Sequence, residues 1–120
     1  MDLIERIAQW QKERQLDKMT VHPAIVYKQI TDEILEAFGL QSIFGAKISD
    51  VTPAETASEL ADIIVYVVGY IMQLGFDPNC IVEEVVKKIE SRQGHYDPAQ
   101  NKWIKTNQGS YQPNYERCKC

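Results

Sequence analysis

The sequence predicts an all-α protein with a four-helix bundle-type fold and an irregular C-terminal arm. Four segments carry apolar residues at helical spacing. Three of them begin at a proline, which fits the first turn of a helix. No segment between them alternates apolar and polar residues as a half-buried strand would. The helical domain is expected over residues 1–94 and the arm over residues 95–120.

Proline and glycine mark where the helices begin and end. Pro23 disfavours helix at the residue before it and fits a first turn, and Gly39 ends that helix. Thr52 before Pro53 has the order of an N-cap residue and a first-turn proline, and Asp77-Pro78 begins the fourth helix. The two glycines and the missing period in residues 39–53 predict a long loop there. The helices are therefore expected over residues 2–15, 23–38, 53–74 and 78–91.

The third predicted helix is apolar over most of its circumference. From residue 60 to residue 74 the exception is one stripe, formed by Glu59, Asp62, Tyr66, Gly69 and Gln73. A helix that is apolar in nearly every direction is central in a fold. A chain of 120 residues has difficulty covering such a helix alone, so we expect a homodimer or homotetramer.

Composition limits the classes of partner. The net charge is −4 and the isoelectric point is near 5.1, which argues against a broad nucleic-acid-binding face. The longest apolar run, Ile63–Met72, has ten residues, about half of what a membrane span needs. No basic-then-apolar signal segment opens the chain. We therefore expect a cytoplasmic protein that binds neither nucleic acid nor membrane.

The three cysteines, Cys80, Cys118 and Cys120, leave one thiol over if two of them pair. The composition is not that of a disulfide-stapled secreted domain, so reduced thiols are expected. Cys118 and Cys120 lack the two further ligands that a tetrahedral zinc site needs, which favours a flexible tail over a soft-metal site.

Two pairs of carboxylates border apolar helix faces. Glu33 and Glu36 lie one turn apart on the second predicted helix, and Glu59 and Asp62 have the same spacing on the third. Each pair alone is consistent with solvated surface charge. Two pairs brought together would repel each other unless a cation or shared protons lay between them. Their common position therefore predicts a cation site.

The ligand types indicate which cation. The four side chains offer only carboxylate oxygen, and neither pair contains the Glu-x-x-His of di-iron bundle sites. This set fits Mg²⁺, with Mn²⁺ as a substitute. Magnesium in such sites often completes its coordination with substrate phosphate oxygens, so the pattern indicates phosphoryl-transfer chemistry.

The segments DEILE (32–36) and ELADIIVYVVGYIMQLGFD (59–77) together resemble the E-x-x-E and E-x-x-D motifs of the MazG-like all-α nucleoside triphosphate pyrophosphatases. The resemblance covers about residues 1–93. It implies magnesium-dependent hydrolysis of a nucleoside triphosphate to the monophosphate and pyrophosphate. It also implies that Glu33, Glu36, Glu59 and Asp62 are the metal ligands.

Further site residues are expected beside the four metal ligands. Glu36 is our preferred acceptor of the proton from the attacking water. Lys88 and Arg92 match part of the family's basic cluster after the fourth helix and would bind phosphate, although solvated helix-end cations explain them equally well. Tyr66 lies on the acidic stripe and is a candidate substrate contact, with packing as its alternative role.

Two rival functions stay open. A phosphoribosyl-ATP pyrophosphohydrolase resembles the same fold and uses the same metal chemistry. A non-catalytic helical interaction module would keep the bundle without the chemistry, but all four acidic positions are filled. The residues carry no readable code for the preferred base or sugar.

Overall fold

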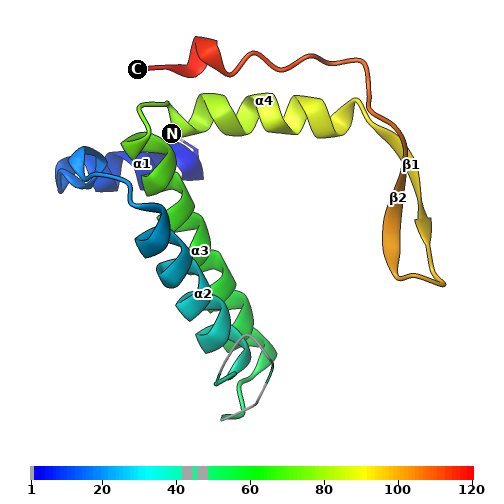
Figure 1. Ribbon diagram of the computed structural model, residues 1–120, viewed down its shortest axis with the longest axis horizontal. Coiled ribbons are helices and arrows are strands. Elements are labelled where there is room, and N and C mark those ends of the chain that lie inside the picture. Colours follow the sequence, from blue (N-terminus) through cyan, green and yellow to red (C-terminus); the bar gives the residue numbers. More distant parts are fainter. Residues whose placement is uncertain (1, 42–44, 46–48) are drawn as a thin grey trace. The chain divides into compact units, whose positions relative to one another are not determined.

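The computed structural model describes residues 2–41, 45 and 49–120, so residues 42–44 and 46–48 of the predicted loop lie outside the described residues. The chain forms two compact units, Met1–Gly75 and Phe76–Cys120. The described residues form four α-helices and a two-stranded sheet (Figure 1). The chain is thus mostly helical, as predicted. The assignment of residues 1–94 to one domain and the four-helix bundle itself stay predictions.

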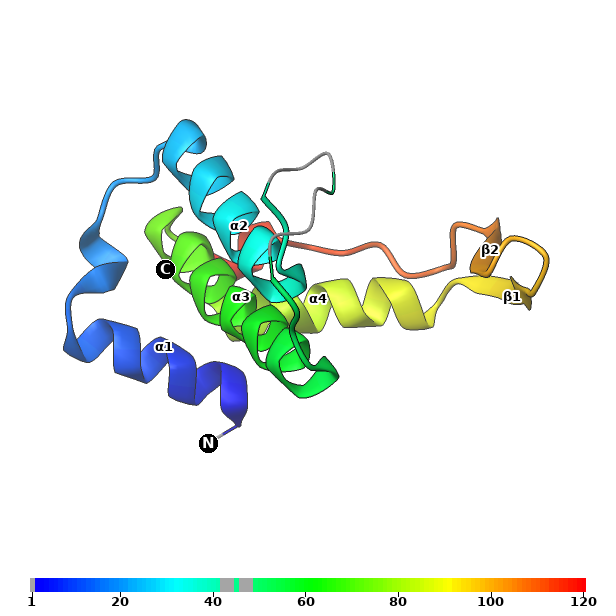
Figure 2. The same cartoon turned by 90° about the horizontal axis from the view of Figure 1, so that it is seen from below.

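The first unit contains α1 (Leu3–Glu13), the 3-10 turn η1 (Leu16–Lys18), α2 (Pro23–Phe38) and α3 (Pro53–Gln73). Both views show α2 alongside α3, and the chain runs in opposite directions in these two helices (Figures 1 and 2). Helix α1 packs on α3 through a small core of Ala8, Val68 and Met72. Three of the predicted helix starts are found, at the three prolines.

Local chemistry fixes the ends of the helices that carry the acids. Thr52 caps α3 in a capping box with Glu55, in which each side chain accepts a hydrogen bond from the other residue's backbone N–H. Gly39 ends α2 in the left-handed conformation (φ 65°), which glycine adopts without strain. The Thr56 hydroxyl then donates to the Ala37 carbonyl at 2.7 Å, which ties the start of α3 to the end of α2.

A buried glutamine sets the contact between α1 and α3. The Gln11 side chain is almost fully buried, and its Nε2 donates to the Val65 carbonyl at 2.7 Å. Gly69, one turn further along α3, allows this approach, because a Cβ at that position would collide with the Gln11 carboxamide oxygen. Helix α3 therefore accepts a polar side chain at a place where it carries no side chain of its own.

The second unit contains α4 (Pro78–Glu90), strands β1 (Gln93–Asp97) and β2 (Lys102–Asn107), and the 3-10 turn η2 (Glu116–Cys118). The strands form an antiparallel hairpin with Tyr96 opposite Trp103. The prediction of an arm without strands was therefore wrong. Both faces of the hairpin are largely exposed, so its sequence lacks the alternation that marks a half-buried strand.

The second unit also holds a disulfide between Cys80 and Cys118, while Cys120 is free and exposed. The expectation of reduced thiols and a flexible tail is corrected by this pairing. The backbone explains the proximity: the Asp77 N–H donates to the Cys118 carbonyl at 2.8 Å, and Phe76 pairs with Lys119 in an isolated bridge. Contacts between residues so far apart in the chain are not visible in cysteine spacing.

Candidate metal centre

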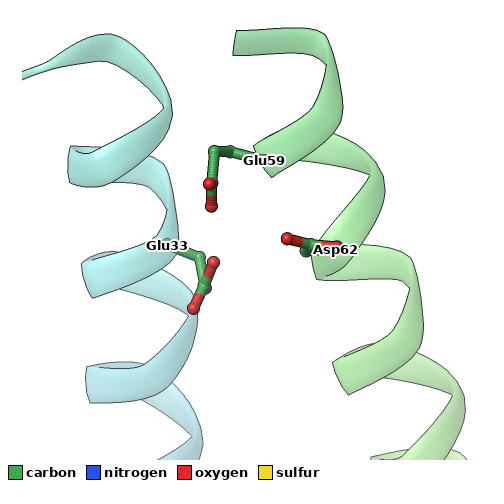
Figure 3. Close-up of side chains that lie close together, drawn as sticks. All are labelled: Glu33, Glu59 and Asp62. Atoms are coloured by element: carbon green, nitrogen blue, oxygen red, sulfur yellow. The ribbon is translucent and has the colours of Figure 1, made fainter. Parts of the chain in front are cut away.

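Three carboxylates from two helices converge in the first unit. Glu33 on α2 faces Glu59 and Asp62 on α3, and each contributes an oxygen that lies within 4.8 Å of the other two (Figure 3). The i, i+3 spacing places Glu59 and Asp62 on the same side of α3. The opposite direction of α2 brings Glu33 alongside them. The structure thus unites three of the four predicted ligands.

The fourth predicted ligand, Glu36, is not part of this group among the described residues. It lies one turn further along α2, is exposed, and lines a separate cavity of about 380 Å³ with Asp32 and Ser49. Its charge nevertheless acts on the group, because it is one of the causes that raise the pKa of Glu33. Glu36 as a ligand or proton acceptor stays a prediction.

Electrostatics show that the acids are crowded. The pKa of Glu33 is raised, first by partial burial and then by the negative charges of Glu36, Glu59 and Asp62. A hydrogen bond with Glu59 favours the protonated form of Glu33 as well. Without a cation, Glu33 therefore holds its proton more strongly than an isolated carboxyl group does. A cation between the three acids would relieve the repulsion among their negative charges.

Tyr66 adjoins the acids on α3. Its pKa is raised, with the charge of Glu33 as the largest cause and a hydrogen bond to Glu33 as a further one. The phenol therefore stays protonated and serves as a hydrogen-bond donor to that carboxylate. The structure places this predicted substrate contact beside the acids, in the wall of the adjoining cavity.

A cavity of about 490 Å³ in the first unit reaches the acids. Its wall includes Glu33 and Asp62, and much of the rest is apolar. Four members of the predicted α3 stripe line it, namely Asp62, Tyr66, Gly69 and Gln73. The stripe that interrupts the apolar surface of α3 is therefore the side of the helix that faces a cavity.

Sequence reasoning did not assign a role to the other polar side chains that line this cavity. The Tyr70 hydroxyl donates to the Gln29 carboxamide oxygen, which fixes the orientation of Gln29. The Gln73 Nε2 donates to the Leu16 carbonyl at 3.2 Å. Gln29 lies four residues before Glu33 on α2, and this spacing, which puts the two side chains on one side of the helix, was the signal in the sequence that could have found it.

The remaining predicted substrate contacts, Lys88 and Arg92, belong to the second unit. Lys88 lies in the last turn of α4, and Arg92 follows the helix. Their role in binding phosphate stays a prediction.

None of the family models, curated proteins or solved structures compared with the chain matches it. Membership of the MazG-like family therefore stays a prediction that depends on the motifs. Within the described part of the chain, no helix combines the length and apolar character that crossing a membrane requires.

Proposed function

We propose that the protein is a magnesium-dependent nucleoside triphosphate pyrophosphohydrolase, which cleaves its substrate to the monophosphate and pyrophosphate. The observation that carries the proposal is the convergence of Glu33, Glu59 and Asp62 from two helices. These residues come from the two motifs whose order and spacing resemble the MazG-like enzymes. Surface acids without a shared role would have no reason to converge from two separate motifs.

The donor set fits magnesium. All three side chains offer hard carboxylate oxygens, which Mg²⁺ prefers. Two ligands of one Mg²⁺ ion lie at most about 4.2 Å apart, because each is about 2.1 Å from the metal. The observed oxygens lie within 4.8 Å of one another, so the three side chains would draw closer together around a bound ion. Glu33, Glu59 and Asp62 would hold the ion, and Glu36 is the proposed fourth ligand.

When bound, magnesium supplies charge neutralisation for the triphosphate and lowers the pKa of a water molecule that attacks phosphorus. The residues of the chain supply the rest. Glu36, which is exposed beside the three acids, would accept the proton of the attacking water. Tyr66 would hold the Glu33 carboxylate by donating a hydrogen bond to it.

The adjoining cavity is suited to the nucleoside part of the substrate. Its volume of about 490 Å³ falls within the usual range of small-molecule sites, about 300–1,000 Å³. Its mixture of apolar wall and oriented carboxamides suits a flat heterocycle with polar edges. Because Gln29 accepts from Tyr70 through its oxygen, its amide NH₂ is the group left to donate to a ligand.

We also propose that the active form is a homodimer or homotetramer. On α2 and α3 several large apolar side chains are between 40% and 49% exposed, which is more than a small monomer usually leaves uncovered on adjacent helices. These side chains are Ile34, Phe38, Leu60, Ile64 and Val67. Covering them with a second copy would complete the core around α3.

The direct test is a panel of ribo- and deoxyribonucleoside triphosphates, incubated with the protein in magnesium and in a chelator. Products are separated by ion-exchange chromatography. We expect equal amounts of monophosphate and pyrophosphate from at least one substrate, and only with magnesium. Diphosphate and inorganic phosphate as products, or no turnover of any substrate, would contradict the proposal.

A further inference from the structure

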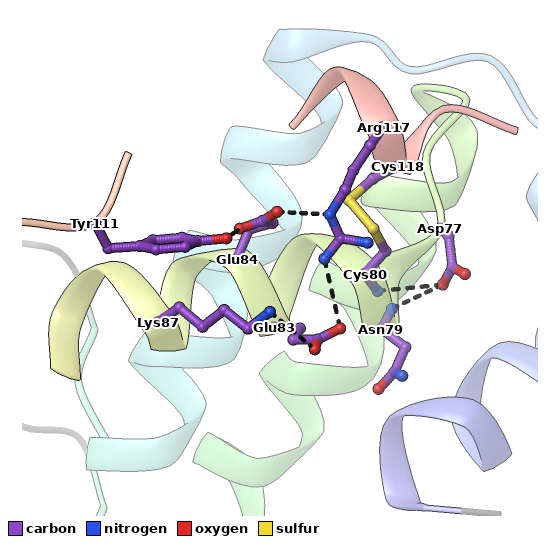
Figure 4. Close-up of polar contacts among 9 residues, drawn as sticks. All are labelled: Asp77, Asn79, Cys80, Glu83, Glu84, Lys87, Tyr111, Arg117 and Cys118. Atoms are coloured by element: carbon purple, nitrogen blue, oxygen red, sulfur yellow. Dashed lines mark hydrogen bonds and ion pairs between the residues drawn. A yellow bond between two sulfur atoms is a disulfide. The ribbon is translucent and has the colours of Figure 1, made fainter. Parts of the chain in front are cut away.

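The end of the chain is held along α4 by several independent contacts. We call residues 108–120 the C-terminal strap. The Tyr111 N–H donates to the Ser91 hydroxyl at 3.3 Å at one end of α4. The Cys80–Cys118 disulfide joins the strap to the other end of the same helix (Figure 4). The strap is therefore fixed at both ends of α4.

Between these two points lies a buried carboxylate. Glu84 on α4 is only 1% exposed. One of its oxygens accepts a hydrogen bond from the Tyr111 hydroxyl, and the other accepts from Arg117 Nε at 2.6 Å. Both partners belong to the strap. Because an unpaired buried carboxylate is strongly unfavourable, release of the strap requires Glu84 to become solvated as well.

The disulfide is reachable from solvent. It lines an open cavity of about 330 Å³, with Cys80 partly exposed and Cys118 buried. The chain neighbours of Cys118, Arg117 and Lys119, line the same cavity together with Asp77 and Glu83. Both cations are engaged by acids, Arg117 by Glu83 and Glu84 and Lys119 by Glu116, so the proposal depends on access to the disulfide and not on charge beside it.

We propose that Cys80–Cys118 is an exchange site for a small thiol of the glutathione class, and that its reduction releases the C-terminal strap from α4. The cavity supplies the route to the sulfur, and Glu84 couples the rest of the strap to the same event. This inference does not depend on the proposed hydrolase activity, because all of its residues lie in the second unit.

The chemistry proceeds in two exchanges. The thiolate of the first small thiol attacks Sγ of Cys80, the more exposed of the two cysteines. The bond between the two protein sulfurs breaks, and Cys118 leaves as a thiolate that takes up a proton. A second small thiolate then attacks the sulfur of the first small thiol in this mixed disulfide, and Cys80 leaves as a thiolate that takes up a proton. The small thiol leaves as its own disulfide, two electrons have passed to the protein, and both cysteines are thiols.

The test uses the full chain in buffers with increasing ratios of reduced to oxidised glutathione. Samples are quenched in acid, unfolded and alkylated, and the thiols are counted by mass spectrometry. Under oxidising conditions we expect at most one thiol per chain, that of Cys120, because oxidised glutathione also reacts with this exposed thiol; under reducing conditions we expect three. Amide hydrogen exchange over residues 108–120 should become at least tenfold faster when the count reaches three.

Two variants distinguish release of the strap from reactions of the free thiol. Cys80→Ser should show fast exchange in the strap at every glutathione ratio, while Cys120→Ser should behave like the wild type except for one thiol fewer. A count of at most one thiol at all ratios would overturn the proposal, as would three thiols under oxidising conditions. Three thiols with unchanged exchange in the strap would also overturn it, because the disulfide would then not hold the strap.

Discussion

Replacing Glu59 with glutamine removes one charge from the three-carboxylate group while preserving the size of the side chain. At 4.8 Å, the largest separation between the paired oxygens, two unit charges in water repel by about 0.9 kcal/mol before salt screening. Glu59 takes part in two such pairs, so without metal the substitution should stabilise the fold by about 1–2 kcal/mol. In a domain of this size, each kcal/mol of added stability raises the melting temperature by roughly 4–8 °C.

The pH dependence of this effect follows from Glu33. Its pKa is raised in the folded state, so its contribution to stability is complete below the unfolded pKa and is lost as pH rises through the folded one. The charge on Glu59 is one cause of that rise. The gain from Glu59→Gln should therefore be larger at pH 8 than at pH 4, where Glu33 is protonated.

The assay is thermal unfolding of the wild type and of Glu59→Gln, each in a chelator and in a series of magnesium concentrations. Magnesium should raise the melting temperature of the wild type and raise that of the variant much less, because ligand binding to the folded state stabilises it. Glu13→Gln, at an exposed acid on α1, is the matched control. Equal melting temperatures in chelator together with equal magnesium responses would refute the reasoning.

Three further predictions concern packing, acid stability and assembly. Gly69→Ala should cost about 1–3 kcal/mol by overpacking against Gln11, measured by urea unfolding, and the loss should shrink in the Gln11→Ala background; a gain in stability would contradict the contact. Tyr111 and then Arg117 lower the pKa of Glu84, so its contribution is complete above the unfolded pKa and is lost as pH falls through the folded pKa. Glu84→Gln should therefore flatten the acid limb of the stability curve, and an unchanged limb would contradict this. Light scattering should give two or four times the chain mass of 13.8 kDa, whereas a monomer would contradict the proposed assembly.

The helical part of the fold was predictable because local chemistry determines it. Proline in the first turn at Pro23, Pro53 and Pro78 and the capping residue Thr52 mark boundaries that the structure reproduces. The acidic positions on α2 and α3 were predictable for the same reason. Spacing along a helix specifies which face a side chain occupies, and two helices with acids on one border can bring them together.

The second unit was less predictable because long-range contacts determine it. The β1–β2 hairpin has no buried face to impose alternation on its sequence. The Cys80–Cys118 pair joins residues separated by 38 positions. Its formation depends on a strap that returns along α4, and nothing local in the sequence encodes that return. The burial of Glu84 depends on the same strap and was missed with it.

The most direct test of the proposed metal centre measures pyrophosphate release in magnesium. The wild type, Asp62→Asn and the control Glu13→Gln are compared on one substrate that the wild type cleaves. Asp62→Asn keeps the shape of the side chain and removes one ligand charge from the three-carboxylate group. We predict that Asp62→Asn loses turnover by orders of magnitude while circular dichroism shows an intact helical fold. Glu13→Gln should keep wild-type turnover. Wild-type turnover in Asp62→Asn would show that the carboxylates meeting between α2 and α3 are not the catalytic metal centre.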